Sequence, residues 1–94
     1  MSEIVVIKTI AGEEIISSMS LMDNKKFLKK PRVLQLMQSP NGIQVGFIPY
    51  IISNPDAECW MSDHYIATIV PATKEVEDAY LRNTSGLEIA QTLT

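Results

Sequence analysis

The sequence predicts a mainly β protein: a strongly bent, five-stranded antiparallel sheet, or small open barrel, followed by a C-terminal helix. Apolar runs rich in Val and Ile recur along the first 70 residues, and these stiff, β-branched side chains favour a pleated sheet. Turn residues separate the runs. After Pro71 the apolar period changes from about 2 to about 3.6 residues, which indicates a helix. The predicted strands are 4–10, 14–22, 33–38, 43–52 and 64–70, and the predicted helix is 74–85.

The first two strands form a predicted hairpin. Ala11-Gly12-Glu13 interrupts the apolar pattern, and Gly12 can adopt the positive φ that a tight turn requires. Along the second strand, alternation separates an apolar face from a mixed one. We expect the apolar face, formed by Ile15, Met19 and Leu21, to point into the core.

The third and fourth strands flank the strongest turn signal in the chain. Ser39-Pro40-Asn41-Gly42 combines a Pro that presets φ with an Asn-Gly pair that accepts positive φ, so strands 33–38 and 43–52 should pair as a hairpin. Gly46 and Pro49 interrupt the fourth strand and are typical of a bulge, a bend or an edge strand. Its expected core face comprises Ile43, Val45, Phe47 and Ile51.

The last strand and the helix follow a mixed loop. Strand 64–70 is apolar on both faces, which is typical of a strand that is buried on two sides or lies in a subunit interface. Thr73 is a favourable N-cap for the helix and Gly86 can terminate it. One helix face should pack on the sheet or on a neighbouring subunit: Val76, Ala79, Tyr80 and Asn83.

Composition indicates one small globular domain that spans residues 1–94. Apolar residues make up 46% and charged residues 20%, which excludes a disordered chain. The net charge of -3 argues against a general electrostatic affinity for nucleic acid. The single cysteine excludes an intrachain disulfide, and the sequence lacks a signal peptide pattern and an apolar run of about 20 residues. We therefore expect a cytoplasmic protein without a membrane partner.

A basic segment at 25–32, KKFLKKPR, contains five of the eight cations. Clustered Lys and Arg can contact phosphates and supply the sequence-independent part of nucleic-acid affinity. The alternative is a solvated loop and a strand start that is protected by charge. The two readings stay open from the sequence.

The segment 53–64 mixes acidic residues with Cys59 and His64 but lacks the paired ligand spacing of a zinc site. No nucleophile with a neighbouring base, phosphate loop or metal cluster is visible, so we expect no catalysis, no metal and no cofactor. Trp60 could serve as a core cap, an interface anchor or a platform on which a base stacks.

One motif carries a family resemblance. A turn Gly, a strand with apolar residues at fixed offsets, and an Asp eleven positions after the Gly form a frame that resembles the first motif of Sm and LSm proteins. The matching residues are Gly12, Ile15, Ile16, Met19, Met22 and Asp23. Lys25 and Phe27 stand where the family has its base-stacking residue and its Asn. Ile69-Val70-Pro71 stands where the second motif has an apolar residue followed by Arg-Gly.

The resemblance implies an Sm-like fold, and the stretches AGEEIISSM and HYIATIVPATKEVEDAYL are similar to small Sm-like proteins of tailed phages, especially cyanophages. It implies a homo-oligomeric ring of about five to seven subunits, closed by pairing of the fourth strand with the fifth strand of the next subunit. The expected partner is single-stranded RNA, in the host cytoplasm if a phage encodes the protein. The alternative is an interaction or assembly scaffold that uses Trp60, Tyr65 and the helix face.

Two sets of candidate residues follow from this reading. The nucleic-acid-binding candidates are Asp23, Lys25, Lys26, Phe27, Lys29 and Lys30. The candidates for the interface between subunits are Phe47, Tyr50, Tyr65, Ala67 and Ile69. An independent argument supports self-assembly, because apolar strands at the edges of an open sheet promote aggregation unless another chain covers them.

Overall fold

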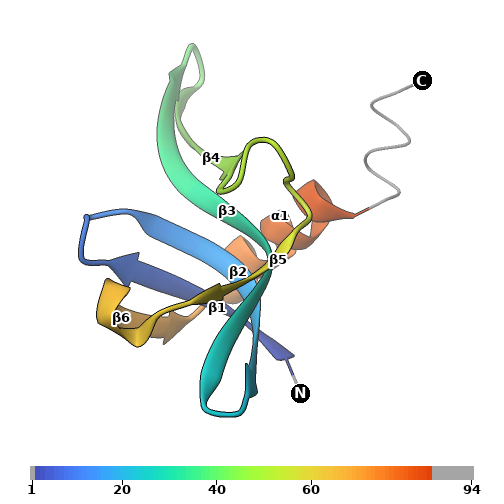
Figure 1. Ribbon diagram of the computed structural model, residues 1–94. Coiled ribbons are helices and arrows are strands. Elements are labelled where there is room, and N and C mark those ends of the chain that lie inside the picture. Colours follow the sequence, from blue (N-terminus) through green and yellow to red (C-terminus); the bar gives the residue numbers. More distant parts are fainter. Residues whose placement is uncertain (1, 86–94) are drawn as a thin grey trace.

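The computed structural model describes residues 2–85, which form a strongly bent antiparallel sheet and a helix (Figure 1). The sheet has six strands in the order β4-β3-β2-β1-β6, and β5 pairs with β3 beside this path. The mainly β class and the C-terminal helix are confirmed, whereas the number of strands is six instead of five. The elements are β1 (Ser2–Thr9), β2 (Glu14–Met22), β3 (Lys25–Ser39), β4 (Gly42–Pro49), β5 (Glu58–Met61), η1 (Asp63–Tyr65), β6 (Ile66–Pro71) and α1 (Lys74–Thr84).

The third strand is much longer than the predicted 33–38, because the basic segment belongs to it. Asp23 and Asn24 have φ of 53° and 62° and close a two-residue turn between Met22 and Lys25. Asp and Asn tolerate this left-handed region, so the chain returns at once as β3. The reading of the basic segment as a loop is therefore wrong.

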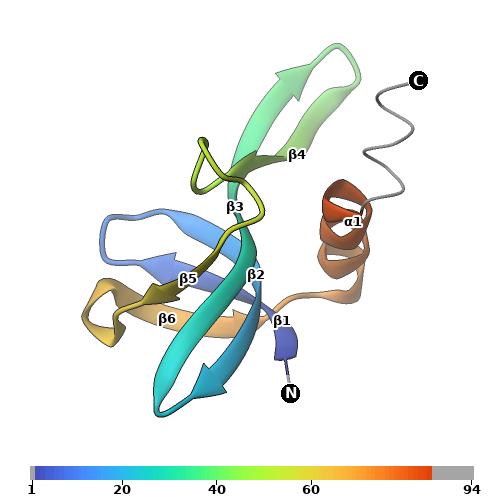
Figure 2. The same cartoon turned by 45° about the vertical axis from the view of Figure 1, so that its right-hand side comes forward.

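A bulge bends β3 near its middle. The β2–β3 register shifts between Ile16 and Ser18, and Lys30 has a φ of 53°. The N-terminal half of β3 pairs with β5 and the C-terminal half pairs with β4, so the two halves run in different directions (Figure 2). The pairing of β4 with β3 is continuous through Gly46, which makes β4 a regular edge strand.

Two further boundaries differ from the prediction. The fourth strand ends at Pro49, eight residues lead to β5, and β5 itself was not predicted because four residues carry too little periodicity. A 3-10 turn over Asp63–Tyr65 delays the last strand to Ile66. Backbone pairing with the distant strand β3, of Phe27 with Trp60 for example, is what makes β5 a strand.

The core lies inside the bend of the sheet. Its buried side chains come from β1, β2, β3 and β5: Val5, Ile7, Ile15, Met19, Leu28 and Met61. Leu21 was expected on this face but is 63% exposed, because β2 extends past the core there. Ile43 and Val45 were also expected in the core, yet both are exposed, since β4 pairs with the part of β3 that projects from the barrel.

The helix α1 lies on the opposite face of the bend. Thr73 Oγ1 accepts a hydrogen bond from the Val76 amide at 3.3 Å, which confirms the N-cap. Tyr80 is buried, while Val76 and Ala79 are half-buried. Asn83 is exposed and Thr84 takes the buried position instead, so the predicted face was wrong at its C-terminal end. Gly86, the predicted terminator, lies outside the described residues.

Candidate interaction surfaces

Three of the five cations in the basic segment are held by the protein itself. Lys26 Nζ lies 2.7 Å from Asp63 Oδ1, and Arg32 Nη2 lies 3.2 Å from Asp56 Oδ1. Lys30 Nζ donates to the carbonyl of Thr84 at 3.2 Å. The acidic partners come from the segment that contains β5, more than 20 residues away in sequence. Much of the basic charge is therefore balanced locally.

The remaining basic residues share a surface with aromatic side chains. Lys25, Phe27 and Lys29 alternate onto the outer face of β3, because Leu28 between them is buried in the core. Trp60 pairs with Phe27 across the strands and is 55% exposed. The Nζ atom of Lys25 lies 5.1 Å from the centroid of the Trp60 ring, within the range of a cation–π interaction. We name Lys25, Phe27, Lys29 and Trp60 the outer aromatic surface.

The nucleic-acid-binding candidates are thus divided between several positions. Lys25, Phe27 and Lys29 lie together on the outer aromatic surface. Lys26 belongs to the other face of the strand and contacts Asp63, and Lys30 occupies the bulge. Asp23 is exposed in the turn between β2 and β3. Trp60 completes the surface, and only strand pairing could have assigned it there.

The hairpin formed by the end of β3 and by β4 is the most apolar exposed part of the described chain. The sequence from Val33 to Ile48 contains no Asp, Glu, Lys or Arg. Figure 2 shows this hairpin projecting beyond the rest of the sheet. Its exposed apolar side chains are Leu36 at 72%, Met37 at 47%, Ile43 at 70%, Val45 at 48% and Ile48 at 37%. We name residues 33–48 the uncharged hairpin.

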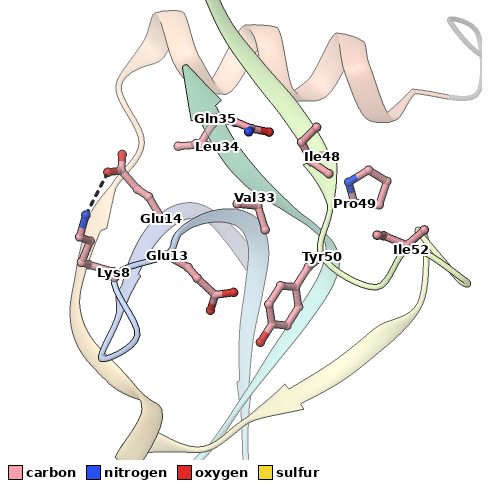
Figure 3. Close-up of a pocket in the computed structure, with 11 residues that line it drawn as sticks. Lys8, Glu13, Glu14, Val33, Leu34, Gln35, Ile48, Pro49, Tyr50 and Ile52 are labelled. Atoms are coloured by element: carbon pink, nitrogen blue, oxygen red, sulfur yellow. Dashed lines mark ion pairs between the residues drawn. The ribbon is translucent and has the colours of Figure 1, made fainter. Parts of the chain in front are cut away.

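Two cavities lie at the base of the uncharged hairpin. The larger, about 580 Å³, separates the β1–β2 turn from Val33, Ile48 and Tyr50 (Figure 3). Glu13 and Glu14 form its polar wall, and Lys8 Nζ lies 3.8 Å from Glu14 Oε1. The smaller, about 330 Å³, has mainly apolar walls: Leu34, Leu36, Val45 and Val76, together with Glu14 and Gln35.

A polar cluster surrounds Glu13, which lines the larger cavity. The hydroxyl of Tyr65 donates to Glu13 Oε1 at 2.8 Å, and the hydroxyl of Thr9 donates to the same oxygen at 3.2 Å. The hydrogen bond to Glu13 is the main reason that the pKa of Tyr65 is raised. Burial is the main reason that the pKa of Tyr50 is raised, and the Glu13 charge adds to it. These contacts fix the β1–β2 turn against η1.

The predicted interface residues lie near both edges of the sheet. Phe47 is half-buried on β4, and Ala67 is exposed on β6 at the other edge. Tyr50, Tyr65 and Ile69 are partly buried against the core, so each has a packing role within the chain. The set thus comprises two outer positions and three positions at the rim of the core.

Cys59 is half-buried beside the core, and burial raises the pKa of its thiol, which favours the unreactive protonated form. Within residues 2–85, no group of three His, Cys, Asp or Glu side chains is placed to hold a metal ion. No helix in that range is long and apolar enough to cross a membrane. Comparison with protein-family models and with curated proteins gives no match for this chain.

Proposed function

We propose that this chain is an Sm-like subunit that assembles into a homo-oligomeric ring and acts as an assembly scaffold. The uncharged hairpin carries the proposal. Soluble proteins protect exposed strands with charges, Pro or a cover, whereas residues 33–48 expose five large apolar side chains and no charge. These 16 residues carry no charge that would repel a second copy. Contact between copies would therefore bury the exposed apolar side chains without an electrostatic cost.

The two edges of the sheet provide a route to a closed ring. Among residues 2–85, β4 has a strand partner only on the β3 side, and β6 has one only on the β1 side. Pairing of β4 in one copy with β6 in the next is a heterologous contact, and such contacts close into a ring when the rotation between copies permits it. Phe47 and Ala67 lie on these strands.

The Sm-like part of the proposal rests on the motif that runs from Gly12 to Asp23. Gly12 has a φ of 91° in the turn before β2, and Asp23 has a φ of 53° in the turn after it. The motif therefore begins and ends at the two turns that bound one strand of a bent antiparallel sheet. This arrangement supports the resemblance at the level of fold.

Light scattering on wild type and two variants tests the ring. We expect a mass of about five to seven subunits for the wild type. Val45→Glu should lower that mass because it places a charge in the proposed apolar interface. Leu81→Glu makes the same chemical change at an exposed position of α1 and should leave the mass unchanged. A wild-type monomer, or equal masses for Val45→Glu and wild type, would contradict the proposal.

A second candidate function is binding of single-stranded RNA, which the outer aromatic surface favours. Exposed aromatic rings beside cations suit bases that stack and phosphates that need a counter-charge. Lys25 and Trp60 provide this pair in one place. Titration with oligo(U) and oligo(A) at low and moderate salt tests it, since phosphate contacts weaken as salt rises. If neither oligonucleotide bound at low salt, the RNA-binding function would be rejected and only the scaffold function would remain.

A further inference from the structure

A third cavity, of about 380 Å³, lies at β5 and at the segments that precede and follow this strand. Aromatic side chains reach it from the end of the β4 segment, from β5 and from η1. Seven of the described residues line it, and none of them is charged: Tyr50, Ile51, Cys59, Trp60, Met61, Ser62 and Tyr65. We name these seven residues the Tyr–Trp pocket.

The aromatic side chains of the Tyr–Trp pocket are accessible to a ligand. Trp60 is 55% exposed, and Tyr50 and Tyr65 are half-buried. The face of an aromatic ring has a negative electrostatic potential, so several rings around one cavity attract a cation. Ile51 and Met61 add apolar wall, which suits methyl groups better than a strongly hydrated ion. The lining therefore suits a cation that carries alkyl groups.

The charges around the pocket favour a cation as well. The segment 33–73 contains no Lys or Arg, and the whole pocket lies within it. The hydroxyl of Tyr65 donates to Glu13 Oε1 at 2.8 Å, and a hydrogen bond to a carboxylate makes the phenol ring more electron-rich. Burial, and then the charge of Glu13, raises the pKa of Tyr50. The Glu13 carboxylate therefore contributes a negative potential at two walls of the pocket.

Cations of β3 lie opposite β5 but are not among the lining residues. Lys26 Nζ is balanced by Asp63 at 2.7 Å. Lys25 is exposed, and its Nζ atom lies 5.1 Å from the centroid of the Trp60 ring. This contact shows that the ring of Trp60 can hold an ammonium group.

We propose that the Tyr–Trp pocket binds a quaternary ammonium group. Such a group spreads its charge over methyl groups, so aromatic rings and apolar walls can contact it at the same time. The cavity of about 380 Å³ falls within the range of small-molecule sites, about 300–1,000 Å³. The group could belong to a small molecule such as choline or to a trimethylated lysine of another protein. All seven residues come from one chain and lie outside the uncharged hairpin, so the site does not depend on the ring.

Titration of the isotope-labelled full chain with choline, followed by NMR of the backbone amides of Met61 and Tyr65, tests the site. The matched ligand is the neutral analogue of choline in which carbon replaces the quaternary nitrogen. It has the same shape but no charge, and it should bind at least about tenfold more weakly. Equal affinities would overturn the proposal, because the pocket would then bind by apolar burial alone. Absence of shifts with choline would overturn it as well.

Variants locate the binding at the rings. Trp60→Leu keeps an apolar side chain and should weaken choline binding at least about tenfold. Phe47→Leu makes the same kind of change on β4, outside the pocket, and should leave the affinity unchanged. Equal losses in these two variants would overturn the site. Lys25→Gln should bind choline at least as tightly as the wild type, because it removes a competing cation from Trp60, and weaker binding would contradict the proposal.

Two further ligands identify the source of the quaternary ammonium group. They are a peptide that contains trimethyllysine and the same peptide with unmodified lysine. Tighter binding of the trimethylated peptide than of choline would assign the group to a protein, and the reverse order would assign it to a small molecule. Both results support the site. Equal affinity for the two peptides would overturn it, because the methyl groups would then play no part.

Discussion

The hydroxyl of Tyr80 lies 2.8 Å from the carbonyl oxygen of Lys30 and 3.0 Å from that of Lys29. The same hydroxyl accepts from the amide of Ser18 at 3.3 Å. The bulge disrupts the regular ladder at these backbone groups. The hydroxyl of Tyr80 contacts all three, and Ser17 Oγ on β2 also donates to the carbonyl of Lys29 at 3.0 Å. The helix therefore stabilises the bend in β3, together with Ser17 of β2.

Replacing Tyr80 with Phe should destabilise the fold by about 1–2 kcal/mol, because the part-buried carbonyl of Lys30 and amide of Ser18 lose the hydroxyl that contacts them. Urea unfolding followed by circular dichroism would measure the loss. Tyr50→Phe is the control, since Tyr50 is only half-buried, and its effect should be smaller. Equal losses in the two variants would show that the hydroxyl of Tyr80 does not stabilise the bulge.

Arg32 fixes the segment between β4 and β5. Its buried guanidinium donates to the carbonyl of Pro55 at 2.6 Å and contacts Asp56 at 3.2 Å. Arg32→Met should cost about 1.5–3 kcal/mol of unfolding free energy, because the charge-assisted hydrogen bond that the buried guanidinium donates to Pro55 is lost.

Asp56→Asn serves as the control for Arg32. The Asp56 side chain is 51% exposed, and exposed ion pairs contribute at most about 1 kcal/mol. Limited proteolysis should cleave between Pro49 and Glu58 faster in Arg32→Met than in Asp56→Asn. Equal cleavage rates in the two variants would contradict a fixing role for Arg32.

All three tyrosines should ionise at higher pH in the folded protein than in the unfolded chain. The pKa values of Tyr50 and Tyr80 are raised above 10.0 mainly by burial, and that of Tyr65 mainly by its hydrogen bond to Glu13. A raised pKa favours the protonated form, so its contribution to stability is complete below pH 10.0 and is lost as pH rises through the folded value. Absorbance of tyrosinate should therefore appear at higher pH in buffer than in urea. A lower midpoint in buffer would contradict this prediction.

Trp60 is the only tryptophan in the sequence, so its fluorescence reports directly on the outer aromatic surface. If single-stranded RNA binds there, oligo(U) should quench the emission, because a base stacks on the ring. Lys25→Gln should weaken binding and lower the salt slope by about one unit. Lys26→Gln is the matched control, because Lys26 contacts Asp63 on the other face. Equal effects of the two substitutions would contradict a site at Trp60.

The sequence determined the elements whose signals are local. The predicted strand 14–22 and helix 74–85 agree with β2 and α1 almost to the residue, because alternation, a turn Gly and an N-cap Thr act within a few positions of each other. The apolar alternation of Ile43 and Val45 also predicted a strand correctly. The alternation could not show that both side chains are exposed. It identifies which residues share a face of the strand, but not whether another element covers that face.

Only the tertiary structure decided how the basic segment is used. In sequence, residues 25–32 are a cluster of cations next to a Pro, and charge suggests a loop or a phosphate contact. In the fold, Asp63 and Asp56 neutralise Lys26 and Arg32 from segments 37 and 24 residues away, and Tyr80 stabilises the bulge at Lys30. These partners are distant along the chain and become neighbours only when the sheet bends, so local patterns carry no information about them.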